Sequence, residues 1–96
     1  MASYIALMNF TEQGIRTIKE TTRRAEAAEA LARKFGVTIK NVQWTLGAYD
    51  AVAQLDAPDD QALTAFELAI AAQGNVRTQT LRAFSRDEMN AILQRA

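Results

Sequence analysis

The segment SYIALMNF, residues 3–10, is apolar at both of its alternating sets of positions. One set consists of Tyr4, Ala6, Met8 and Phe10, and the other of Ile5 and Leu7. Successive side chains of a strand point to opposite faces of a sheet, so this pattern predicts a strand that is covered on both faces. Helices of the same chain can cover one face, and a second copy of the chain is the simplest cover for the other.

The length and composition limit the classes of protein to be considered. A chain of 96 residues is the size of one domain, and we expect a single domain over residues 1–96 that buries only about two thirds of its unfolded surface. Basic and acidic residues number eleven each, which gives no reason to expect a nucleic-acid or membrane partner. The absence of a long apolar run or a leader favours a cytoplasmic protein.

Cysteine and histidine are both absent, which excludes disulfides and thiol chemistry and removes the commonest metal ligand and general base. The acidic residues Asp56, Asp59 and Asp60 do not have metal-site spacing, and they sit where a helix begins. We therefore expect no metal site and no cofactor.

The longest helix is predicted to follow the first strand. Thr11 can cap it, an apolar stripe at steps of three and four runs from Ile15 to Phe35, and Gly36 can end it in the left-handed conformation. Three acid–base pairs four residues apart lie on its other face, which we interpret as solvated: Glu12 with Arg16, Glu20 with Arg24, and Glu29 with Arg33.

The remaining elements complete a recognisable order. Strands are predicted over residues 37–46, with a bulge near Lys40 and Asn41, and over residues 51–56 and 76–84. A second helix is expected from Pro58 to the Gly74 cap. Ser85 and Glu88 form a capping box for a short tail helix. The fold class is therefore α+β: a ferredoxin-like βαββαβ sandwich, with a four-stranded antiparallel sheet and two helices on one face, plus a C-terminal helix.

The stretch Gly47-Ala48-Tyr49-Asp50 allows two interpretations. In the structural one, Gly47 supplies a positive φ angle in a strand-to-strand turn and Asp50 bonds to nearby backbone amides. In the functional one, Asp50 is a general base, or Tyr49 and Asp50 hold a polar ligand. A lone Tyr-Asp pair is weak evidence for catalysis.

Arg77 is unusual because it lies inside a predicted strand. It could be a charge on an edge strand, or it could form an ion pair with Asp50 or Asp56. Arg77 could instead bind the carboxylate or phosphate group of a small anionic metabolite. The ligand-binding residues predicted for that second alternative are Arg77, Gln79, Gln43, Thr45 and Tyr49.

Four motifs in order carry a resemblance to a known family: TEQGIR at 11–16, LGAYD at 46–50, APDD at 57–60 and GNVRTQTLRAF at 74–84. With them the chain resembles the GYD domain family of small bacterial proteins, whose members have no settled biochemical function. Ala48 separates the glycine from the tyrosine, so the pattern here is Gly-x-Tyr-Asp. The resemblance implies a relative of the dimeric α/β-barrel folds and assigns no catalytic residues.

Two functions remain open, and whether the protein is an enzyme stays undecided. The preferred function is a small-molecule-binding or interaction protein that acts as a homo-oligomer, most simply a dimer, with a trimer or higher ring as the alternative. The other is a cofactor-free enzyme, an isomerase or decarboxylase, with Asp50 as base, Tyr49 as hydrogen-bond donor and Arg77 as anion anchor. The tail helix, apolar at Met89, Ile92 and Leu93, could cover an edge of its own sheet or reach a neighbour.

Overall fold

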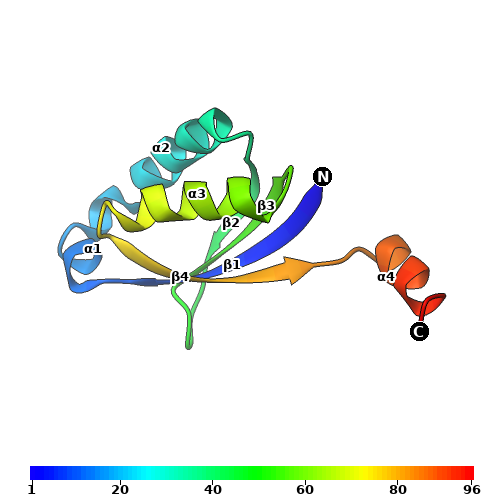
Figure 1. The fold of residues 1–96 in the computed structure, drawn as a ribbon. Helices are drawn as coiled ribbons and strands as arrows, with labels where there is room; N and C mark the ends of the chain where they lie inside the picture. Colours follow the sequence, from blue (N-terminus) through cyan, green and yellow to red (C-terminus); the bar gives the residue numbers. More distant parts are fainter.

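A computed structural model describes residues 1–96 and contains one four-stranded sheet with its helices (Figure 1). The elements are β1 (Ala2–Phe10), α1 (Glu12–Arg16), the 3₁₀ helix η1 (Ile18–Glu20), α2 (Thr21–Lys34), β2 (Thr38–Trp44), β3 (Ala51–Ala57), α3 (Asp60–Ala71), β4 (Val76–Ala83) and α4 (Arg86–Leu93). The strand order is β2-β3-β1-β4 and every pair is antiparallel. This is the ferredoxin-like plan with an added C-terminal helix, as the element order predicts.

The prediction of a single helix over residues 12–35 is wrong, because the chain forms α1, η1 and α2 there. Thr11 does cap the start, accepting a hydrogen bond from the Gly14 amide at 3.1 Å. The helix then breaks at Thr17, which has φ −117° and ψ 37°. Gly14 is buried so tightly that an added Cβ would lie 2.1 Å from the carbonyl oxygen of Asn75. Packing of this first turn against the start of β4 therefore fixes α1, and α2 takes a separate course.

The ion pairs on this segment also differ from the expected ones. Glu12 and Arg16 do pair, at 2.7 Å. Glu20 pairs with Arg23 at 2.9 Å instead of with Arg24, and Glu29 forms no ion pair with Arg33. Because the backbone turns at Thr17, the Arg24 guanidinium reaches back to it and is partly buried rather than solvated.

The local signals for turns and caps are confirmed in the other elements. The register between β2 and β3 shifts between Ile39 and Asn41, which is the expected bulge. Gly36, Gly47 and Gly74 have φ angles of 74°, 119° and 82°. The start of α3 differs by two residues, because Asp59 caps it by accepting a hydrogen bond from the Ala62 amide at 2.8 Å, so Pro58 precedes the helix.

The helices cover one face of the sheet only (Figure 1). Tyr4 and Ala6 of β1 point toward them and belong to the buried core. That core also contains Ala32, Val37, Ala53, Leu55, Ala57, Leu63 and Phe66. Ile5 and Leu7 consequently point to the other side of the sheet, which the helices leave uncovered.

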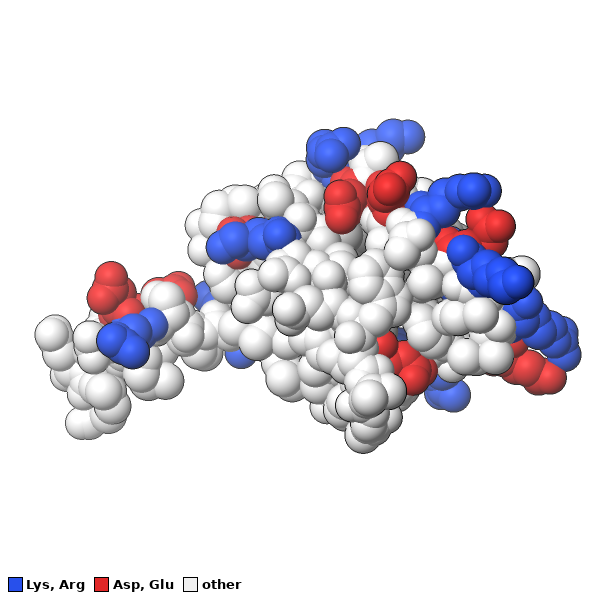
Figure 2. All heavy atoms as spheres, turned by 180° about the vertical axis from the view of Figure 1, so that it is seen from behind, with Lys and Arg blue, Asp and Glu red and all other residues white.

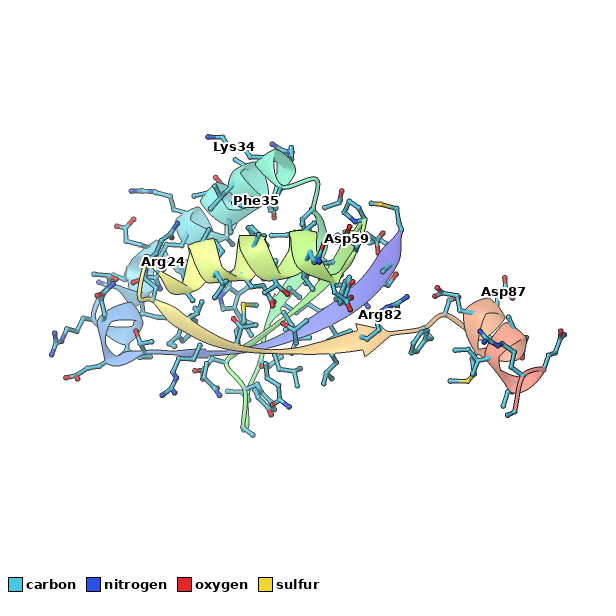
Figure 3. The ribbon with its side chains drawn as sticks, in the orientation of Figure 1. Arg24, Lys34, Phe35, Asp59, Arg82 and Asp87 are labelled. Atoms are coloured by element: carbon cyan, nitrogen blue, oxygen red, sulfur yellow. The ribbon has the colours of Figure 1, made fainter.

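The tail helix α4 stands away from the rest of the chain (Figure 1). Ser85 and Glu88 form the expected capping box, with bonds of 2.8 and 3.1 Å between each side chain and the other residue's amide. Arg82 lies where β4 leads into this segment (Figure 3), and its guanidinium lies 4.5 Å from the centre of the Phe84 ring. The same guanidinium donates to the Ser3 carbonyl at 3.1 Å. Beyond these contacts the chain runs outward, and α4 covers no edge of its own sheet (Figure 1).

Candidate functional site

The candidate site is the sheet surface opposite the helices, which we call the outer face. It consists of the outward side chains of the central part of the sheet: Ile5, Leu7, Val52, Gln54, Gln79 and Leu81. One row crosses all four strands through Gln43, Val52, Leu7 and Gln79, which are successive register partners. The middle of the row is apolar and its two ends are amides. No element of the chain lies over this face (Figure 1).

The loop between β2 and β3 projects on the same side as the outer face (Figure 1). Its base is closed by the Thr45 amide, which donates to the Asp50 carbonyl at 2.9 Å, and by the Thr45 hydroxyl, which donates to the Tyr49 carbonyl at 2.6 Å. Leu46 at its tip is fully exposed. Figure 2 shows that charged side chains gather over the helical side and on the tail. The loop tip, from Leu46 to Ala48, carries none.

The structure separates the functions of the neighbouring residues Tyr49 and Asp50. The Tyr49 hydroxyl donates to Oε1 of Gln79 at 3.0 Å, so Thr45, Tyr49 and Gln79, three of the five predicted ligand-binding residues, do meet. Oδ2 of Asp50 accepts a hydrogen bond from the Phe10 amide at 2.9 Å, and the Asp50 amide donates to the Met8 carbonyl. Asp50 thus joins the loop to the end of β1, which is the structural interpretation of this residue.

Arg77 and Gln43 lie on the two edge strands of the sheet, β4 and β2. Arg77 is exposed, is the register partner of Asn9, and belongs to none of the three ion pairs, so neither Asp50 nor Asp56 pairs with it. Asp56 is instead 3.7 Å from Lys40. The five predicted ligand-binding residues are therefore spread across the outer face and its loop, and their role in binding stays a prediction.

A cavity on the helical side of the sheet contains two charged residues that the sequence patterns did not indicate as functional, Arg24 and Glu67. Glu67 is half-buried on α3, and burial raises the pKa of its carboxyl although a hydrogen bond from Thr80 acts in the opposite direction. A single acid within the apolar run from Ala65 to Ala71 is the sequence signal that could have indicated it. Arg24 gave no such signal, because it fits the pattern of a solvated helix face.

Two further properties describe the chain as a whole. None of the helices combines the length and the apolar character that a membrane crossing requires. No three histidine, cysteine, aspartate or glutamate side chains are grouped so that they could hold a metal ion.

Two comparisons with known proteins cover nearly the full chain. The model of the GYD domain matches residues 4–93. A relative in Thermus thermophilus, described as "Glutamine synthetase and cystathionine beta-lyase binding protein", is 33% identical over 95 residues. That alignment covers 98% of this chain and 100% of the relative. The chain therefore belongs to the GYD domain family.

Proposed function

We propose that this protein is a protein-binding module, a single domain of residues 1–96 that acts as a homodimer. The observation that carries the proposal is the uncovered outer face, where Ile5, Leu7, Val52 and Leu81 lie together with no helix over them. Monomeric proteins seldom leave such an apolar surface open to water. Two outer faces packed against each other would form a closed sandwich of two sheets, each with its helices outside.

The tail helix supports the same proposal. Met89, Ile92 and Leu93 are all exposed on α4, and this helix lies away from its own sheet (Figure 1). In the proposed dimer α4 reaches the partner and covers apolar surface there. A stable interface between two proteins buries about 1,200–2,000 Å² in total, and the outer face with α4 offers surface for one of that class.

The name of the Thermus thermophilus relative supports a protein partner over a small molecule alone. We therefore propose glutamine synthetase and cystathionine beta-lyase as the proteins to test first with this chain. The loop tip around Leu46, which is exposed and uncharged, and the surface of the assembled dimer are available for such a contact. Arg77 and Gln79 lie on the edge strand β4, so in the dimer they would lie at the edge of the interface between the two outer faces. Polar groups at such an edge set specificity more than affinity.

Two measurements test the proposal. Sedimentation equilibrium at micromolar concentration should give twice the mass of one chain, and a mass of 10.6 kDa would contradict the dimer. Surface plasmon resonance with each purified enzyme, taken from the organism that supplies this chain, should show saturable binding. If the protein is a dimer but binds neither enzyme, the proposal of these two protein partners is wrong and the proposal of a dimer still holds.

A further inference from the structure

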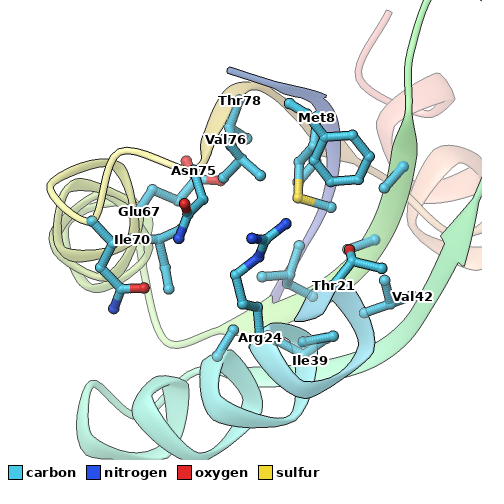
Figure 4. Close-up of a pocket in the computed structure, with 18 of the residues that line it drawn as sticks. Met8, Thr21, Arg24, Ile39, Val42, Glu67, Ile70, Asn75, Val76 and Thr78 are labelled. Carbon is cyan, nitrogen blue, oxygen red and sulfur yellow. The ribbon is translucent and has the colours of Figure 1, made fainter. Parts of the chain in front are cut away.

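The cavity between α2, α3 and the sheet has a volume of about 110 Å³. Its walls are mainly apolar, and small side chains create the space: Ala6, Ala51 and Ala53 on the strands, with Ala25 and Ala28 on α2. Larger apolar side chains, among them Met8 and Ile70, also line it (Figure 4). An apolar cavity of about 150 Å³ holds benzene, so this one has room for a body of about four or five carbon atoms.

Arg24 is the one cation among the residues that line this cavity. Figure 4 shows its side chain reaching from α2 into the middle of the pocket, with Glu67 and Ile70 of α3 on the far side. Arg24 is only partly buried.

The guanidinium of Arg24 is fixed by neutral groups alone. Nη1 donates to the carbonyl and hydroxyl oxygens of Thr17 at 3.2 and 2.7 Å, and Nη2 donates to the Gly14 carbonyl at 3.2 Å. Arg24 belongs to none of the three ion pairs of the chain. A guanidinium has five N–H donors, so one on Nη2 and the one on Nε remain for a ligand. A carboxylate accepts two such neighbouring donors.

Glu67 is the one acid among the residues that line the cavity, and it also belongs to none of the three ion pairs. It accepts a hydrogen bond from the Thr80 hydroxyl on the neighbouring strand β4. Burial raises the pKa of this carboxyl, and the hydrogen bond from Thr80 acts in the opposite direction. The two free donors of Arg24 are therefore the groups in the cavity that a carboxylate can bind.

We propose that this cavity binds a small carboxylate with a compact aliphatic body, whose carboxylate is held by Arg24 and whose body fills the space beside Met8 and Ile70. This cavity lies on the side of the sheet opposite the outer face. An experiment that disproves carboxylate binding here therefore does not disprove the proposed dimer, and the reverse also holds. The cavity also differs from the anion site predicted around Arg77.

The test uses the full chain and the fluorescence of Trp44, which is the single tryptophan and lines the same cavity. Three probes of the same shape are titrated: isovalerate, its neutral amide isovaleramide, and the cation isoamylamine. Isovalerate should bind saturably and at least about tenfold more tightly than the amide, because a hydrogen-bonded charge is lost in the amide. Equal affinity for the three probes, tighter binding of the amine, or no saturable binding of isovalerate would each overturn the proposal.

Variants assign the binding to residues. Arg24→Gln should lower isovalerate affinity by at least about tenfold, whereas Arg77→Gln, a matched change on the outer face, should leave it unchanged. Glu67→Gln should raise the affinity, because a negative charge facing the ligand is removed. Loss of binding in Arg77→Gln instead of Arg24→Gln would place the anion on the outer face and overturn the assignment.

Thermal unfolding of each variant shows whether it is folded. If Arg24→Gln does not fold, Arg24→Lys replaces it, since lysine keeps the charge and loses the planar pair of donors. That variant should bind isovalerate more weakly and still prefer it to the amide. Unchanged affinity in a folded Arg24→Lys would show that the guanidinium is not the ligand-binding group.

Discussion

The hydroxyl of Tyr49 donates a hydrogen bond of 3.0 Å to Oε1 of Gln79, which ties the β2–β3 loop to β4, the strand at the far edge of the sheet. Because β1 lies between β3 and β4, the Tyr49 side chain reaches across β1 on the outer face, while the tip of the loop stays exposed. Two residues that are thirty positions apart therefore define one border of the proposed dimer interface.

The first prediction concerns the conformation of this loop. Gly47 has a φ angle of 119°, which residues with a Cβ rarely adopt, although an added Cβ would meet nothing within 4 Å. Gly47→Val should therefore lower the free energy of unfolding by more than about 1 kcal/mol through backbone strain alone. Denaturant unfolding measures this, with Ala48→Val as the control in the same loop. Equal stability of both variants would remove the strain argument.

Gly14 should be intolerant of a side chain for a different reason. Replacing glycine by alanine inside a helix normally stabilises a protein by about 0.5–1 kcal/mol. Here the new Cβ would lie 2.1 Å from the backbone oxygen of Asn75, so Gly14→Ala should destabilise, by about 1–3 kcal/mol. The sign of the change in unfolding free energy decides the matter, and a stabilised Gly14→Ala variant would contradict the close packing of α1 on Asn75.

Arg77 should be dispensable for folding. It is exposed and has no ion-pair partner, so Arg77→Leu should change the free energy of unfolding by less than about 0.5 kcal/mol. If the predicted anion site on the outer face exists, the same variant should bind an anionic ligand more weakly there. An Arg77→Leu variant that unfolds would show a structural role that the contacts of this residue do not indicate.

Stability at alkaline pH should depend on Tyr4. The hydrogen bond from its hydroxyl to the Asp60 carboxylate, and then burial, raise the pKa of Tyr4 from 10.0 to about 12. Below pH 10 both folded and unfolded chains hold the proton, and the stabilising effect is complete. Between pH 10 and about 12 the unfolded chain loses the proton first, so stability should fall as pH rises. Urea unfolding across this range should show a smaller fall for Tyr4→Phe than for the unmodified protein.

The dimer should depend on one face of the molecule and not on the other. Leu81 on the outer face and Leu68 on α3 are both exposed in the single chain, at 41% and 66%. Leu81→Glu should raise the dimer dissociation constant by at least about tenfold, because a charge would enter an apolar interface. Leu68→Glu should leave it unchanged. Sedimentation equilibrium compares the two, and dissociation caused only by Leu68→Glu would place the interface on the helical side.

Features that depend on neighbouring residues could be predicted from the sequence. The Thr11 cap, the Ser85–Glu88 capping box, the positive φ angle of Gly47 and the bulge after Ile39 each follow from local chemistry or from a change of hydrophobic period. The two-sided apolar pattern of β1 likewise predicts that the sheet face opposite the helices is apolar at Ile5 and Leu7. Together with the order of the elements along the chain, these features predict the fold class.

Features that depend on contacts distant in sequence could not be predicted in the same way. The break at Thr17 accompanies the packing of Gly14 on Asn75, sixty-one residues later in the chain, which no pattern in the helix itself reveals. The cavity arises from alanines on three elements that become neighbours only after folding. Arg24 belongs to the site because the backbone turns ahead of it, so its helical spacing alone assigns it to solvent.

Because α4 lies away from the rest of the chain, this helix should unfold easily in a free protomer. A helix of eight residues without tertiary contacts is marginal in water, even with a good capping box. Backbone amides from Met89 to Leu93 should therefore exchange their hydrogens quickly in a free protomer, far faster than those of β1 or β3. Docking against a partner would slow that exchange, which makes the last turns of the chain a built-in reporter of assembly.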